Sequence, residues 1–176
     1  ALKLSYVSSK PHKGNGTTKE FFGMEVGMAK YFSSLQNEEQ HYGIIKCAYN
    51  GSSIVKDASS DRGDWNVYDE LGNGENAINL IDTINQAVAR FEEEGYKVVL
   101  MGCAWMQGEA DYATCKDYHS RMKALMNYIR SNTGYESLPF ALGELASQNY
   151  PDKTNPFYIS LEYLKKKGEG LVDIVR

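Results

Sequence analysis

Cysteine is scarce in this sequence of 176 residues, which has only Cys47, Cys103 and Cys115. An odd, sparse set is not a disulfide framework, and no pair has the C-x-x-C spacing of a zinc site. We therefore expect Cys47 and Cys103 to be buried free thiols, and we expect no bound metal. Long apolar runs are also lacking. No stretch approaches the roughly 20 residues that cross a bilayer, which argues against a membrane-spanning segment.

An excess of positive charge is missing as well. The formal net charge is −4, and the only compact basic run, Lys165-Lys166-Lys167, suits the solvated end of a helix. Because phosphate binding needs clustered Lys and Arg, the composition argues against a nucleic-acid partner. No apolar leader is visible, although a mature secreted chain has the same appearance, so these features leave localisation open.

What the sequence does contain is an alternation of strand and helix patterns. Strands are predicted at 2–7, 42–48, 97–104, 138–145 and 171–175, and helices at 22–35, 77–94, 112–132 and 157–167. Apolar strands that alternate with helices predict an α/β fold whose parallel sheet is covered on both faces. The length fits a single domain, residues 1–176. Since the chain opens in one predicted strand and stops after another, we expect that domain to be incomplete at both ends.

The most informative segment is Trp105-Met106-Gln107-Gly108-Glu109-Ala110-Asp111, which follows an apolar strand. Open α/β sheets place their ligand chemistry at the carboxyl ends of strands, and buried polar groups are costly without partners. A purely structural interpretation is a helix start, in which Asp111 caps the next helix and Trp105 is core. The long polar stretch 50–75 is also typical of a functional loop.

This segment resembles the Trp-x-Gln-Gly-Glu-x-Asp motif of the SGNH-type carbohydrate esterases, which include sialate O-acetylesterases and some acetylxylan esterases. The segment 47–54 resembles their strand-end Gly-Gly-Thr-x-Ile turn, and 22–29 is similar to their Gly-Pro-Glu helix opening. Trp65 and Leu138-Pro139-Phe140 also match. The resemblance covers roughly residues 20 to 146. It implies a three-layer α/β/α sandwich with a mostly parallel sheet, the flavodoxin-like SGNH hydrolase fold.

The resemblance implies a serine-type esterase that removes O-acetyl groups from a sugar or polysaccharide, with an acetylated carbohydrate substrate and no cofactor. It also favours a secreted or extracytoplasmic location. The family's Gly-Gln-Ser-Asn and Asp-x-x-His turns do not occur here. We expect them before Ala1 and after Arg176 in a longer parent, so that this chain alone is inactive. The alternative is a non-catalytic carbohydrate-binding or structural domain on the same scaffold.

Residue by residue, the resemblance assigns an oxyanion hole to the backbone N–H of Gly51 and the side-chain amide of Gln107. Glu109 is expected to support the Gln107 loop or the serine turn, and Asp111 to cap the following helix. For Gly51 an ordinary turn glycine is the alternative. Three residues of the same turn are expected at the substrate: Tyr49, Asn50 and Ser52. Asn50 replaces the family's first glycine, and Ser52 replaces its threonine, whose local hydrogen bond a serine can also make.

A triad within the chain is a further alternative, with Ser52 or Ser53, His119 and Asp111 as its members. We expect His119 to face solvent, because it lies off the apolar stripe of its helix, so this alternative is disfavoured. Tyr118 and Tyr128 are expected to be core or boundary residues of that helix. Glu144, at the end of its strand, is expected at the edge of the active site.

Overall fold

The structure is a computed structural model, and its chain divides into two compact units, residues 1–48 and residues 49–176. No helix among the described residues is long and apolar enough to cross a membrane. The structure describes residues 24–35, 40–56, 62–113, 115–143, 145, 152, 154–155 and 171–175. The predicted strand 2–7, the predicted helix 157–167 and Glu144 lie outside these described residues.

The first unit contains the helix α1 (Met24–Leu35), and residues 22 and 23 of the predicted helix lie outside the described residues. The Lys46 ammonium pairs with the Glu25 carboxylate, and the rings of Phe32 and Tyr42 stack at 5.2 Å. Residues 40–49 form neither a helix nor a hydrogen-bonded strand, so the strand predicted at 42–48 is wrong for this structure. An apolar pattern alone does not make a strand, because a strand also needs a neighbour for its backbone groups.

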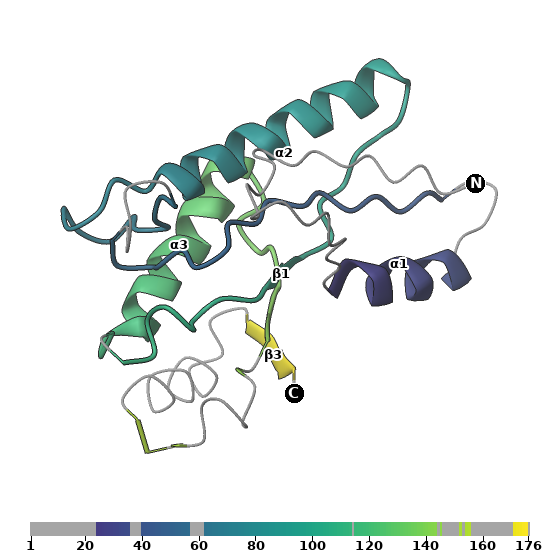
Figure 1. The fold of residues 1–176 in the computed structure, drawn as a ribbon. Helices are drawn as coiled ribbons and strands as arrows, with labels where there is room; N and C mark the ends of the chain where they lie inside the picture. Colours follow the sequence, from purple (N-terminus) through teal and green to yellow (C-terminus); the bar gives the residue numbers. More distant parts are fainter. Residues whose placement is uncertain are drawn as a thin grey trace, which may run out of the picture. The chain divides into compact units, whose positions relative to one another are not determined.

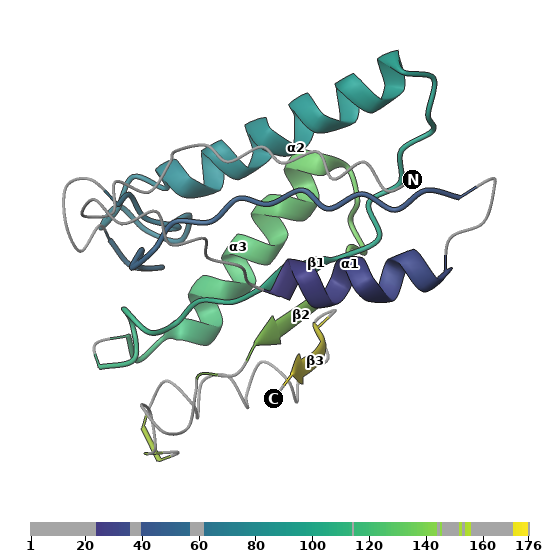
Figure 2. The same ribbon diagram turned by 45° about the vertical axis from the view of Figure 1, so that its right-hand side comes forward.

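The second unit contains a parallel sheet of three strands in the order β1-β2-β3. These are β1 (Cys103–Trp105), β2 (Phe140–Gly143) and β3 (Leu171–Val175), and Figure 2 shows β2 and β3 side by side. In register, Cys103 faces Phe140 and Trp105 faces Leu142. The first two strands are shorter than the predicted 97–104 and 138–145, because a ladder lasts only while neighbouring backbones stay in hydrogen-bonding reach.

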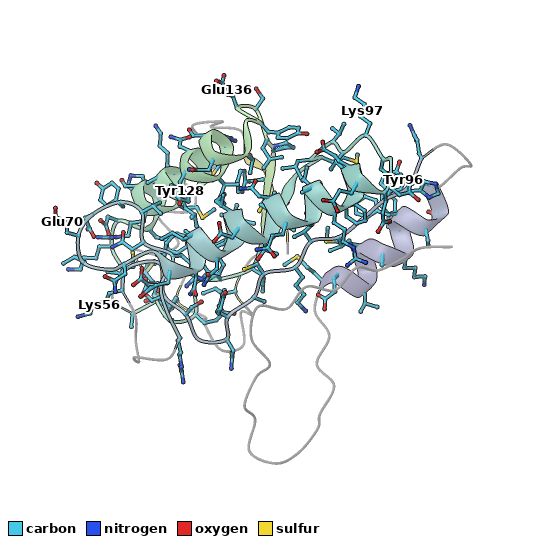
Figure 3. All side chains as sticks on the ribbon, turned by 90° about the horizontal axis from the view of Figure 1, so that it is seen from above. Lys56, Glu70, Tyr96, Lys97, Tyr128 and Glu136 are labelled. Carbon is cyan, nitrogen blue, oxygen red and sulfur yellow. The ribbon has the colours of Figure 1, made fainter. Side chains whose placement is uncertain are left out.

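Two helices of this unit, α2 (Glu75–Glu93) and α3 (Tyr118–Thr133), pack against each other, and Figure 1 shows them crossing. Glycine follows each helix in the left-handed conformation, Gly95 at φ +89° and Gly134 at φ +74°, which confirms both predicted stops. Tyr96 and Lys97, which follow α2, are exposed, and Lys97 points outward in Figure 3. The buried face of α2 comprises Asn76, Ala77, Leu80, Ile81, Thr83, Ile84 and Ala87.

Helix α3 begins at Tyr118 rather than at 112, because two turns precede it. The Asp111 N–H donates to Gly108 O, and the Cys115 N–H donates to Asp111 O. These two hydrogen bonds close turns and do not belong to a regular helix. The predicted apolar face of the helix is confirmed as core. It comprises Tyr118, Met122, Leu125, Met126 and Ile129, each at most 1% exposed. Tyr128, labelled in Figure 3, is half-buried, as expected of a boundary residue.

Helix α3 is joined to the sheet through Arg130. Its guanidinium donates to Leu138 O at 2.9 and 3.1 Å and lies 5.3 Å from the centre of the Phe140 ring. Phe140 and Leu142 are buried, whereas the residues between and after them are half-buried. The described elements thus establish an α/β class with a parallel sheet. The three-layer arrangement and the single domain over 1–176 stay predictions.

Candidate active site

The first half of the site is a tight turn at residues 49–54. Gly51 adopts φ +71°, a left-handed conformation that costs other residues strain. The Ser52 hydroxyl donates to Tyr49 O at 2.8 Å and closes the turn, so the local hydrogen bond predicted for this serine is confirmed. Gly51 is exposed, and among the described residues its N–H donates to no protein acceptor.

The second half of the site is the segment that follows β1. Trp105 ends the strand and is 6% exposed, so its predicted core position is confirmed. Gly108 then reverses the chain at φ +147°, and Asp111 closes the turn through its backbone. Within this turn the Gln107 side chain is half-buried, and it reaches the first turn rather than solvent.

Asp111 is the residue that joins the two halves. Its side chain is fully buried, and its two oxygens accept three hydrogen bonds. Oδ1 accepts from the Ser53 hydroxyl at 2.6 Å, and Oδ2 accepts from the Ile54 N–H at 2.9 Å and from Gln107 Nε2. A buried carboxylate requires such donors, because burial without them costs several kcal/mol. The prediction that Asp111 caps the following helix is wrong, since its carboxylate is used across the site instead.

Gln107 is held at both ends of its carboxamide. Nε2 donates to Ser52 O at 3.0 Å, across 55 residues of sequence, and to Asp111. Oε1 accepts from the Tyr118 hydroxyl at 3.0 Å. An amide nitrogen has two protons, so both are given to protein acceptors in this structure. The same contacts fix which end of the amide is nitrogen, because Asp111 and Ser52 O can only accept.

A cluster of aromatic rings packs beside both turns. Trp65 and Trp105 meet edge to face at 4.9 Å, and Tyr49 meets Trp65 at 5.8 Å. The indole N–H of Trp65 donates to the Ser52 hydroxyl at 2.7 Å, and that of Trp105 donates to the Tyr118 hydroxyl at 3.1 Å. Burial raises the pKa of Tyr118 well above its usual range, so this phenol stays protonated and can donate.

Asp64, which is 1% exposed, organises the loop that carries Trp65. Its carboxylate accepts hydrogen bonds of 2.8–3.0 Å from the backbone N–H groups of Asn66, Asn73 and Gly74. Arg121 of α3 holds the same loop, donating to Asp69 at 2.6 Å. This pairing lowers the pKa of Asp69 well below its usual range, with the Arg121 hydrogen bond as the main cause. The described part of the 50–75 stretch is therefore an ordered support for the first turn.

The other predicted site residues lie around these turns. Glu109 was expected to support either the Gln107 loop or the serine turn. It is exposed, and the carboxylate that contacts Gln107 is that of Asp111. Support of a serine turn by Glu109 stays a prediction. Asn50 is exposed and Tyr49 is half-buried against Trp65, positions compatible with substrate contact. Ser52 is 3% exposed, and its hydroxyl is bonded within the protein, so this side chain faces the turn and not solvent.

Among the described residues, the contacts of Ser53 and His119 differ from those of a serine-histidine-aspartate triad. Ser53 donates directly to Asp111 at 2.6 Å, without a histidine between them, and a ring nitrogen of His119 lies 3.1 Å from the Ser120 hydroxyl. His119 is half-buried rather than solvent-facing. The three cysteines form no disulfide with one another; Cys47 and Cys103 are only half-buried, whereas Cys115 is buried. Among the described residues, no group of three His, Cys, Asp or Glu side chains is placed to hold a metal ion.

Comparison with protein families gives one match that covers most of the chain. Residues 5–167 match the family described as carbohydrate esterase, sialic acid-specific acetylesterase. The chain belongs to this family. The match confirms the resemblance drawn from the Trp105–Asp111 motif and the 47–54 turn, both of which lie inside it. No curated protein and no solved structure matches the chain.

Two residues that contact Asp111 or Gln107 in these turns were missed by sequence reasoning. Ser53 was considered only as a nucleophile, but it binds Asp111. Tyr118 was assigned to the core, which is correct, but its hydroxyl also contacts Gln107. The apolar spacing of α3 predicts that Tyr118 is buried, and a buried phenol usually has a partner. Nothing in that spacing identifies the partner, because Gln107 lies on a different element.

Proposed function

We propose that this chain forms the oxyanion-hole part of a serine-type carbohydrate esterase, which removes O-acetyl groups from a sugar or polysaccharide. In this reaction a serine oxygen attacks the acetyl carbonyl, whose oxygen becomes an anion. The sugar alcohol leaves with a proton from the histidine, and water then releases acetate. Gly51, through its backbone N–H, and Gln107, through Nε2, donate to the anionic oxygen.

One observation carries this proposal: Gln107 Nε2 lies 3.0 Å from Ser52 O, so the amide reaches the residue that follows Gly51. The amide that follows β1 therefore lies next to the turn that carries Gly51. Gly51 has no side chain that would block an acyl group. Its φ of +71° lies in the left-handed region, which glycine adopts without the strain that other residues incur. An amide donor does not titrate, so it serves across a wide pH range.

Donation by Gln107 requires an exchange, because both amide protons already have acceptors. The bond to the neutral carbonyl of Ser52 is weaker than the charge-assisted bond to Asp111. We infer that the proton now on Ser52 O is the one given to the oxyanion, while Asp111 keeps its bond. Catalytic hydrogen bonds commonly tighten only when the reacting group is bound.

The test is hydrolysis of p-nitrophenyl acetate and of an acetylated sugar by the protein expressed from its full reading frame. Gln107→Ala is expected to lower kcat about 100- to 1,000-fold, the usual effect of deleting one oxyanion donor. Gln86→Ala, at an exposed position of α2, is the matched control and should leave kcat unchanged. A loss of only a few-fold for Gln107→Ala would overturn the assignment.

The engaged Gln107 amide also favours a second candidate, a non-catalytic carbohydrate-binding domain on the same scaffold. In that case the three bonds of Gln107 are purely structural, and no exchange takes place. The reading frame around this chain discriminates the two. A Gly-x-Ser turn upstream and an Asp-x-x-His turn downstream support the esterase, and their absence together with sugar binding without hydrolysis supports the binding domain.

We also propose that the parallel sheet β1-β2-β3 belongs to a three-layer SGNH-type sandwich formed by one domain. The parallel sheet, the family match and the position of the Trp105–Asp111 segment at the end of β1 support this arrangement. An experimental structure of the parent protein with helices on both faces of the sheet is the expected result. A sheet with one face open would contradict it.

A further inference from the structure

The buried hydroxyl of Tyr118 makes its polar contacts with the segment that carries Gln107. Its side chain is fully buried, with 1% exposure, and its hydroxyl lies 3.0 Å from Gln107 Oε1 and 3.1 Å from Gln107 O. The indole N–H of Trp105 points at the same hydroxyl from 3.1 Å. A phenol has one proton and can also accept. Since Trp105 can only donate, the Tyr118 oxygen accepts from it, and the single phenolic proton is shared between Oε1 and the backbone O of Gln107.

This contact completes the restraint on the Gln107 carboxamide. Acceptors hold its nitrogen end, and Tyr118 is the donor at its oxygen end. If the hydroxyl is removed, Oε1 loses this partner and the amide is restrained from one end only. An oxyanion donor works only when it is held close to its productive position, within a fraction of an ångström.

We propose that Tyr118 is a positioning residue, which acts through Gln107 and does not itself touch the substrate. This inference rests on the proposed oxyanion role of Gln107. Tyr118 comes from α3, whereas Gln107 lies in the turn after β1, so the helix sets the position of a donor that a different element carries. The ring fills the core, and only the hydroxyl serves the site.

Tyr118→Phe separates these two roles, because it keeps the ring and removes the oxygen. In the protein from the full reading frame, kcat is expected to fall about tenfold with KM unchanged, the effect of losing one hydrogen bond that matters in the transition state. Tyr128→Phe is the matched control, since Tyr128 lies half-buried on the same helix and is outside the site. It should leave kcat and KM as they are.

A double-mutant cycle with Gln107→Ala distinguishes positioning from a general structural effect. If Tyr118 acts through Gln107, Tyr118→Phe changes kcat less than twofold once the amide is gone. An equal factor in both backgrounds would overturn the positioning role. A full loss for Gln107→Ala with no effect of Tyr118→Phe overturns this inference alone, whereas a few-fold loss for Gln107→Ala overturns the oxyanion role and this inference together.

Trp105→Phe examines the same contact without changing Tyr118 or Gln107. It removes the N–H that orients the phenol, so kcat is expected to fall several-fold in the wild-type background and to stay level in the Gln107→Ala background. The side-chain amide signals of Gln107 in ¹H–¹⁵N NMR spectra give a readout independent of turnover. Either aromatic variant should shift them, and unchanged signals in both would contradict the proposal.

Discussion

The backbone N–H of Ile54 donates to Asp111 Oδ2 at 2.9 Å, across 57 residues of sequence. Ile54 is 1% exposed and Asp111 is fully buried, so neither group has water as a substitute partner. The same carboxylate binds Gln107, and it therefore sets the separation between the Gly51 turn and the amide. Each of the two proposed donors would be misplaced if this carboxylate were lost.

Replacement of Asp111 by alanine is expected to destabilise the protein by about 3 kcal/mol, because three donors lose their acceptor and one is a buried backbone N–H. Asp111→Asn should cost about 1 kcal/mol, since its amide oxygen can replace Oδ2. Urea denaturation followed by tryptophan fluorescence measures both, because Trp65 and Trp105 flank the site. Glu109→Ala, at an exposed position of the same motif, is the control and should stay within about 0.5 kcal/mol. Equal stability of all three variants would contradict the joining role of Asp111.

Gly51→Ala separates the conformational role of this glycine from its proposed catalytic role. A φ of +71° is expected to cost alanine about 1–2 kcal/mol. The added Cβ also meets the Arg62 guanidinium, a flexible group that can move. Gly134→Ala is the matched control, since Gly134 has φ +74° with open space around it. Both variants should lose similar stability, but only Gly51→Ala should lower kcat, measured with p-nitrophenyl acetate. If the two variants have the same kcat, the Gly51 turn is not part of the oxyanion hole.

Asp69→Asn is expected to weaken the protein in a way that depends on pH. Its hydrogen bond from Arg121 holds the folded-state pKa of Asp69 below the unfolded value of roughly 4. Such a group stabilises the fold above the unfolded pKa, and that contribution is lost as pH falls through the folded pKa. The urea midpoint of Asp69→Asn should therefore lie below that of the wild type at pH 7, and the gap should narrow below about pH 4. Glu70→Gln, at an exposed neighbouring position labelled in Figure 3, should show no such trend. A gap of constant size from pH 7 to pH 3 would contradict the ion pair.

Much of the fold was readable from the sequence. The apolar spacing of α2 and α3 reflects local helix geometry, and glycine after each helix marks its end, so α2 and the end of α3 were predicted to within two residues. The start of α3 was missed by six residues, because Asp111 looks like a helix cap but is used by Ser53 and Ile54. Strand lengths were overestimated, since they depend on neighbours that an apolar pattern does not reveal.

The sequence by itself determined the family and the two segments that meet in the site, because Trp105–Asp111 and the 47–54 turn are continuous motifs. Only the tertiary structure decided how they are joined: Asp111 bridges the turns, Ser52 faces inward, and Tyr118 binds Gln107. The hydrogen bonds between the two turns join residues more than 50 positions apart in the sequence. They depend on which segments the fold brings side by side, and the spacing of residues within one segment does not predict that.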